Sequence, residues 1–250
     1  MFEALRRNHA ERNYAPLGLE LLVVIFGILI EFQVERWAEE RRERGQEYEY
    51  LVRLKEDLQI EIDHMDEAYA YAQSRINAAM LLEEIVANPS VAEDQPDALP
   101  SALETVSWRS FPQIDAFVYS ELQSSGNLAL IRSASLRRDL AKHYTSIRNY
   151  SRVGLDLEIQ HQFDRLTAGM LTSGELRAIE DESWHDTSHN ISAERAADIA
   201  DELVRRQGAI DLIPNILQHH VFNQKVIEII RDQTMNIIDQ IDLLIEDFDK

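Results

Sequence analysis

Residues 17–34 read LGLELLVVIFGILIEFQV, and this apolar stretch governs how the rest of the chain is interpreted. Its uninterrupted apolar run, Leu21 to Ile30, is shorter than the roughly 20 residues that a membrane span usually needs. The flanks extend it, because Tyr14 and Trp37 lie on either side, about 34 Å of helix apart. Aromatic side chains at both interfaces of a hydrocarbon core about 30 Å thick are typical of a membrane helix. The stretch therefore predicts a transmembrane helix over residues 15–37.

Two alternatives for the apolar stretch stay open. A cleavable signal peptide would be followed by small residues at a cleavage site, but here the sequence continues into a region rich in Glu and Arg. A buried helix of a soluble core is the other alternative, because the apolar run has a suitable length. Short N-terminal segments with arginine, such as Arg6, Arg7 and Arg12, usually stay in the cytoplasm. We expect a single-pass protein of a bacterial inner membrane, with residues 1–14 cytoplasmic and the large remainder periplasmic.

Two carboxylates interrupt the apolar stretch, and their spacing places them on one face of the predicted helix. Glu20 and Glu31 are about three helical turns apart, Val24 and Gly27 lie between them on that face, and Glu35 continues it. Ionised carboxylates in lipid are costly and usually face protein or water, and a glycine lets another backbone approach closely. We interpret this face as packing against another transmembrane helix, from a second copy or a partner. Two alternatives stay open. In the first, both carboxylates extend toward the nearer membrane interface or are protonated. In the second, they line a path for ions or protons.

Composition narrows the class of protein further. The net charge is −20, with 45 acidic against 25 basic residues, which argues against a nucleic-acid-binding surface. The absence of cysteine excludes disulfides, thiolate metal sites and cysteine nucleophiles. Only 8 Gly and 6 Pro among 250 residues argue against a β fold with many tight turns.

Apolar residues at steps of three and four predict long amphipathic helices on both sides of a central region. Residues 38–87 are expected to form a stalk and first long helix, and the stripe within it comprises Leu51, Leu54, Leu58, Ile62, Met65, Tyr69, Ala72, Ile76 and Ala79. A second, nearly heptad stripe, typical of a coiled coil, comprises Ile227, Ile230, Thr234, Ile237, Ile241, Leu244 and Phe248. It could pack within a bundle or across copies. We expect the first and last long helices to pair in antiparallel orientation.

The remaining domain boundaries are predicted from the positions of the prolines. Residues 88–113 contain Pro89, Pro96, Pro100 and Pro112 and are expected to be a linker or loop. The rest of a helical bundle is expected over 114–250. The predicted fold is all-α: a single N-terminal transmembrane helix continues into a stalk and an extramembrane bundle of about five helices.

Two separate blocks of the sequence resemble a widespread family of uncharacterised bacterial membrane proteins, known mainly as a domain of unknown function. The first block is ELLVVIFGILIEFQVERWAEERRER at 20–44, in which Glu20, Gly27, Gln33 and Trp37 stand in matching places. This sequence departs from the family pattern at Glu31 and at the Glu-Arg pair that follows Val34. The second block is YSELQSSGNLALIRSASLRRDLAKHY at 119–144. The resemblance implies a single-span anchor and a helical domain, and it implies no established activity.

The centre of the second block, Ser124, Ser125, Gly126 and Asn127, has two interpretations. A glycine here suits the left-handed position after a helix C-terminus, so the four residues predict a capping turn. A phosphate-binding loop is the alternative, but the repeated glycines and the lysine of such loops are missing.

Two Glu-x-x-His pairs have the spacing of ligands in carboxylate-bridged di-metal bundles. They are Glu61 with His64 and Glu158 with His161. A chain with 45 acidic residues produces such pairs readily by chance, so we expect no metal and no cofactor. A helical-bundle di-metal enzyme is kept as an alternative.

The sequence contains no recognisable catalytic constellation, and we expect no enzymatic activity. The expected function is that of a non-enzymatic membrane-anchored interaction protein, as a homo-oligomer or as an accessory subunit of a larger membrane complex. Its expected partners are the lipid bilayer and other transmembrane helices, from a second copy or a partner subunit, and not nucleic acid. A second alternative is an oligomeric sensor or channel in which Glu20 and Glu31 face the pore.

Overall fold

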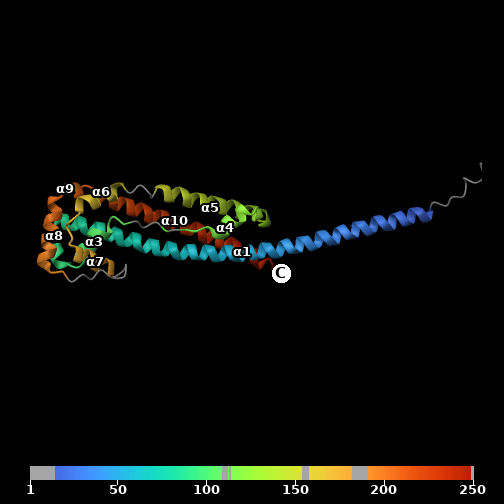
Figure 1. Cartoon of the computed structure of the whole chain (residues 1–250), viewed down its shortest axis with the longest axis horizontal. Helices are drawn as coiled ribbons and strands as arrows, with labels where there is room; N and C mark the ends of the chain where they lie inside the picture. The colour runs from blue at the N-terminus through green and yellow to red at the C-terminus, as the bar shows by residue number, and fades with distance from the viewer. Residues whose placement is uncertain (1–14, 109–111, 113, 154–157, 182–190, 249–250) are drawn as a thin grey trace, which may run out of the picture. The chain divides into compact units, whose positions relative to one another are not determined.

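The structure is a computed structural model that describes residues 15–108, 112, 114–153, 158–181 and 191–248. In these ranges every extended regular element is a helix and no strand occurs (Figure 1). The expectation of an all-α fold is therefore confirmed. Within the same ranges, no helix combines enough length with enough apolar character to cross a membrane.

The helices are more numerous than the five or so expected for the bundle, because short turns divide the second half of the chain. Their bounds are α1 Ala15–Ala87, α2 Val91–Asp94, α3 Ala98–Thr105, α4 Phe117–Ser124, the 3₁₀ helix η1 Asn127–Leu130, α5 Ala134–Val153, α6 Glu158–Thr167, α7 Ser173–Asp181, α8 Ala193–Arg205, α9 Gln207–Ile210 and α10 Ile213–Glu246. The stretch 88–113, expected to be a linker or loop, carries α2 and α3. Leu99 and Leu103 of α3 are buried, so this stretch belongs to the packed core.

The chain divides into two compact units, Met1–Tyr50 and Leu51–Lys250. In its described part, the first unit consists of the N-terminal portion of α1. The second unit contains the rest of α1 and all of the other helices. The division falls inside the segment expected to form the stalk and first long helix.

Within the second unit, α1 and α10 run antiparallel along each other (Figure 1). Three side-chain pairs fix the register: Lys55 with Asp242, Asp66 with Arg231, and Gln73 with Gln224. Residue numbers rise on α1 by the same steps by which they fall on α10, so one register holds along the whole contact. The expected antiparallel pairing of the first and last long helices is confirmed.

The two apolar stripes form the interior of this helix pair. On α1 every residue of the expected stripe is buried except Tyr69, which is 40% exposed, and Ala68 takes the inner position beside it. On α10 the side chains from Ile227 to Ile241 that follow the near-heptad spacing are buried within the bundle. Burial of this stripe inside one chain supports packing within a bundle over packing across copies.

A second part of the core lies where α3, α6, α8 and α9 close against the C-terminal end of α1. Its largest buried side chains are Leu82, Ile85, Leu99, Phe163, Ile199, Leu203 and Ile216. Helix α8 begins with a side-chain cap, in which the Ser192 hydroxyl accepts a hydrogen bond of 3.1 Å from the backbone N–H of Arg195. These short helices, rather than a linker, therefore cover this end of the long pair.

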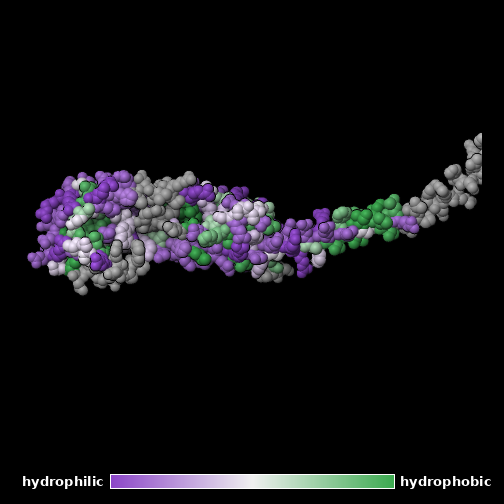
Figure 2. Space-filling model, viewed as in Figure 1, coloured by the Kyte–Doolittle hydropathy of each residue, from purple (hydrophilic) through white to green (hydrophobic). Residues whose placement is uncertain are grey.

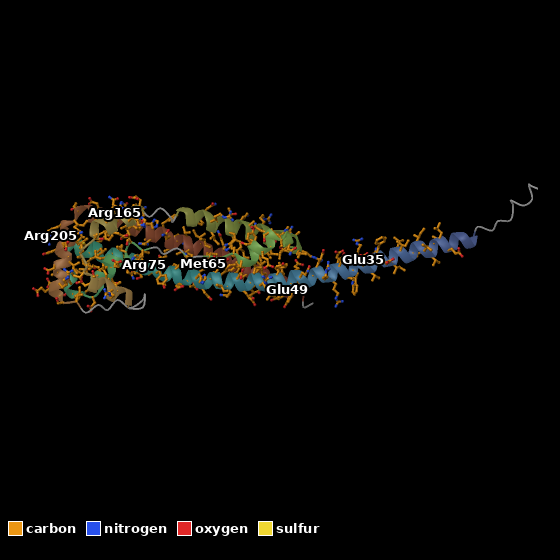
Figure 3. All side chains as sticks on the ribbon, viewed as in Figure 1. Glu35, Glu49, Met65, Arg75, Arg165 and Arg205 are labelled. Carbon is orange, nitrogen blue, oxygen red and sulfur yellow. The ribbon has the colours of Figure 1, made fainter. Side chains whose placement is uncertain are left out.

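Buried polar side chains tie the long helices to the segment after α3. His220 of α10 donates from Nε2 to the Val106 carbonyl at 2.6 Å, and burial lowers the pKa of this imidazole to about 4. Arg75 of α1, labelled in Figure 3, lies with its guanidinium 5.2 Å from the ring centre of Tyr71 and 5.6 Å from that of Trp108. Burial lowers the pKa of Arg75 as well. Stacked aromatic faces are the environment that a guanidinium tolerates best away from water.

A pair of identical substitutions tests the core. Leu82 is fully buried, whereas Leu243 of α10 is 65% exposed. Leu82→Ala should lower the free energy of unfolding by about 2–5 kcal/mol, because it leaves a cavity. Leu243→Ala should change it by less than about 0.5 kcal/mol. Denaturant unfolding followed by circular dichroism measures both, and equal losses would contradict this packing.

Candidate functional site

The N-terminal portion of α1 presents an exposed apolar surface. All eleven large apolar side chains from Leu21 to Val34 are between 43% and 64% exposed. Figure 2 shows them as a continuous hydrophobic band on this part of the helix. We call this band the apolar segment. It is the largest exposed hydrophobic feature of the described residues.

The face expected to pack against another helix lies on the apolar segment and its edges. Glu20, Val24, Gly27, Glu31 and Glu35 are all on α1, and all five are exposed. A Cβ added at Gly27 would meet nothing within 4 Å. Among the described residues, therefore, nothing occupies the approach to this glycine, and the face is open to another helix.

One of the two expected interface anchors lies in the described part. Trp37 is 61% exposed, and the Arg41 guanidinium lies 5.6 Å from its ring centre. An aromatic ring with a cation one turn later is typical of the boundary between an apolar and a wet environment. Tyr14, the other expected anchor, lies outside the described residues.

The Ser-Ser-Gly-Asn block forms a helix end. Gly126 adopts φ 76°, the left-handed conformation that favours glycine, directly after α4. The hydroxyls of Ser124 and Ser125 donate to the Glu121 carbonyl at 3.2 and 2.7 Å, and the backbone N–H of Asn127 donates to the Ser125 hydroxyl at 3.4 Å. These bonds satisfy carbonyl and N–H groups at the helix terminus, so the prediction of a capping turn is confirmed.

The four residues with di-metal spacing are not brought together. Glu61 is buried, whereas His64 and His161 are exposed, and Glu158 accepts a hydrogen bond from Arg165 at 3.0 Å. Among the described residues, no group of three or more His, Asp or Glu side chains could hold a metal ion. The two pairs therefore share only their spacing with carboxylate-bridged bundles.

Glu61 instead belongs to a buried polar cluster with α5. Its Oε2 lies 2.9 Å from His143 Nε2, and its Oε1 accepts from the Tyr144 hydroxyl at 2.7 Å. Glu61 and His143 are almost completely buried, and Tyr144 nearly so. Because a buried carboxylate is costly without donors, the two bonds fix α5 against α1 at this level of the bundle.

The cluster is closed on one side by a second tyrosine. The Tyr119 ring stacks on Tyr144 with ring centres 4.6 Å apart and an angle of 22° between planes. Burial, followed by the charge of Glu61, raises the pKa of the Tyr144 hydroxyl far above its usual value. The hydroxyl is therefore a permanent donor. The cluster holds helices together, and its atoms do not offer a nucleophile to solvent.

A cavity of about 680 Å³ lies between α5 and α10, on the outer side of this cluster. We call it the α5–α10 groove. It is lined by Arg138, Asp139, Ala141, Lys142, His143, Thr145, Ser146, Gln233, Asn236, Ile237 and Gln240. His143 belongs both to the groove and to the buried cluster, and its Nδ1 is buried without a hydrogen-bond partner.

The buried cluster and the groove were not among the expected sites, although the sequence holds a signal for the first. Glu61 stands between Leu58 and Met65 at helical steps of three and four, which places it on the buried face of α1. A carboxylate at such a position requires buried donors. Its partners lie 82 and 83 residues further along the chain, so the spacing alone does not identify them.

Removing one hydroxyl tests the cluster. Tyr144→Phe leaves Glu61 with one donor fewer in a buried site, so the free energy of unfolding should fall by about 1–3 kcal/mol. Tyr69→Phe, which removes the same atom from a side chain that is 40% exposed, is the matched control and should have little effect. Urea unfolding measures both variants. A neutral Tyr144→Phe would show that the Glu61 carboxylate does not depend on this bond.

No family model, no curated protein and no solved structure matches this chain.

Proposed function

We propose that this protein is a membrane-anchored, non-enzymatic interaction protein. No described helix is by itself long and apolar enough to cross a membrane. In this proposal residues 15–37 nevertheless lie in the bilayer as a single span, because a second helix shields the carboxylates that reduce its apolar character. The N-terminus is in the cytoplasm of a bacterial cell, and the second unit, Leu51–Lys250, lies in the periplasm. The span associates with another transmembrane helix, from a second copy or from a partner subunit of a larger complex.

The exposure of the apolar segment carries this proposal. Burying one side chain of this size is worth about 1.5–3 kcal/mol. Covering eleven such side chains, each roughly half-exposed, therefore contributes on the order of 10 kcal/mol. A free energy of that size rivals the whole stability of a typical domain, so the segment requires a covering environment.

The distribution of these side chains favours lipid over a protein groove. Residues 21–26 are six consecutive apolar positions, and successive positions differ by about 100° around a helix. The apolar surface therefore faces every direction. A docking partner covers one face of a helix, whereas the hydrocarbon core of a bilayer covers all of them.

The two carboxylates within the span make its insertion into lipid less favourable. They also indicate which face of the helix packs against protein and not against lipid. A carboxylate at the centre of a span costs about 2.5–3.5 kcal/mol, and less toward the interfaces, where Glu20 and Glu31 would lie. The open approach to Gly27 on the same face supports close packing of a second backbone there. Two helices that pack through this face would remove both carboxylates from lipid.

Membrane extraction tests the proposal. The full-length chain should remain with the membrane after alkaline carbonate treatment, and Ile25→Lys/Ile28→Lys should release a large fraction of it. Each lysine near the middle of a span costs about 3 kcal/mol. The matched control is Ile60→Lys/Ile229→Lys, which changes exposed isoleucines outside the segment and should leave the protein in the membrane.

The orientation of the chain in the membrane is measured in the same cells with reporter fusions. A C-terminal alkaline phosphatase fusion should be active, and a C-terminal fusion that fluoresces only in the cytoplasm should be dark. Recovery of the unaltered chain in the soluble fraction would contradict the proposed membrane anchoring. An active cytoplasmic reporter would reverse the topology but leave the anchoring intact.

A further inference from the structure

We propose that the α5–α10 groove is a binding site for a small amphipathic anion, a molecule with an apolar body and a carboxylate or phosphate group. This inference concerns the second unit alone and does not depend on the membrane anchor. It rests on three features of the groove: its size, two basic side chains without partners, and an unsatisfied nitrogen in its wall.

The size of the groove is that of a ligand site. Its volume of about 680 Å³ falls within the roughly 300–1,000 Å³ of typical small-molecule pockets. Ala141 on α5 and Ile237 on α10 contribute apolar surface, and Thr145, Ser146 and Asn236 contribute uncharged polar groups. Most of the remaining lining residues are charged or polar, so the groove is more polar than a typical small-molecule pocket and suits a ligand that carries a charged group on a short apolar body.

Two basic side chains of α5 define the charge that the groove accepts. Arg138 and Lys142 are one helical turn apart, so they lie on the same side of the helix. In the described part of the chain, neither is paired with a carboxylate. Acidic residues outnumber basic ones by 45 to 25 here, and basic residues elsewhere in the bundle form ion pairs. Arg138 and Lys142 are therefore two cations beside one groove for which the described residues supply no carboxylate partner.

The acidic group in the groove wall is already engaged. Asp139 Oδ2 accepts a hydrogen bond of 3.3 Å from Gln240 Nε2, which connects α5 to α10. Asp139 reduces the positive charge of the groove but does not cancel it, because Arg138 and Lys142 together carry two charges. A monoanion matches the remaining charge, and a strongly hydrated cation does not.

His143 supplies the third feature. Glu61 holds its Nε2, so the ring is fixed, and its Nδ1 is buried without a partner. An unsatisfied buried nitrogen costs about 1–3 kcal/mol. His143 lines the groove, but its Nδ1 is buried, and because Nε2 donates to Glu61 the neutral ring leaves Nδ1 as an acceptor. Only a head group with an O–H, such as a monoprotonated phosphate, could satisfy this nitrogen, after a small movement of the groove wall. The buried cluster thus acts as a rigid base that positions one wall of the site.

The test uses the full-length chain in nanodiscs of zwitterionic phosphatidylcholine, with empty nanodiscs as the blank. Isothermal titration would compare decanoate, decyl phosphate and decyltrimethylammonium, which share an apolar chain and differ in head group. One saturable site is expected for decanoate or decyl phosphate. Binding should weaken by about tenfold or more in Arg138→Gln/Lys142→Gln, because charge-assisted contacts are lost.

Two further variants make the result specific. Arg177→Gln/Arg205→Gln removes the same charge from exposed positions outside the groove, on α7 and α8 (Arg205 is labelled in Figure 3), and should bind like the unaltered chain. Ala141→Trp fills the groove from an exposed position and should abolish binding while the helical circular dichroism is unchanged.

The probe that binds best identifies the head group that the groove prefers. Preference for decanoate would indicate a carboxylic acid, and preference for decyl phosphate would indicate a phosphate-bearing amphiphile such as a lipid fragment; either supports the site. Equal binding of the cationic amphiphile, or undiminished binding in Arg138→Gln/Lys142→Gln, would overturn it. The proposal would also be overturned if neither decanoate nor decyl phosphate gave a signal above that of the empty nanodiscs.

Discussion

Apolar side chains that face every direction around one helix impose the constraint on which this account depends. Between Leu21 and Val34 these side chains are roughly half-exposed. In the second unit the opposite holds, because the apolar stripes of α1 and α10 face each other and the short helices close the end of the pair. One continuous helix, α1, therefore carries two kinds of surface. The first needs an apolar environment from outside the chain, and the second finds it within the bundle.

The second unit also shows how polar groups determine which helices meet. Apolar stripes alone allow several registers, since leucine and isoleucine pack against one another with little discrimination. Three polar pairs between α1 and α10 share a single register, and Glu61 finds donors only where His143 and Tyr144 of α5 stand opposite it. Removing one partner of such a group leaves the other unsatisfied, so these contacts penalise wrong alignments more than they stabilise the right one. The α5–α10 groove borders this fixed arrangement, which gives it one rigid wall.

Local signals in the sequence were sufficient for the two long helices and for the turn after α4, and insufficient for the short helices and for contacts between distant segments. The steps of three and four on α1 and α10 predicted both stripes and their antiparallel pairing, and Gly126 predicted the turn after α4. Tyr69 follows the same spacing yet is 40% exposed, because the neighbouring Ala68 satisfies the steps of three and four between Met65 and Ala72 equally well and takes the buried position. The prolines of 88–113 suggested a linker, but Pro100 lies near the start of α3, where a helix tolerates it. The groove depends on which face of α5 meets α10, and no single segment encodes that.

The most direct test of the central claim is a scan of single cysteines through residues 20–37, each carrying a nitroxide spin label, in phospholipid vesicles. The chain has no cysteine, so every label reports one position. The account predicts strong relaxation by oxygen and weak relaxation by a water-soluble nickel complex from about 21 to 34, deepest near the middle. At positions 24 and 27 it predicts reduced access to oxygen, where the second helix packs. Ready access of the nickel complex throughout the scan would contradict the account, because it would place the apolar segment in water.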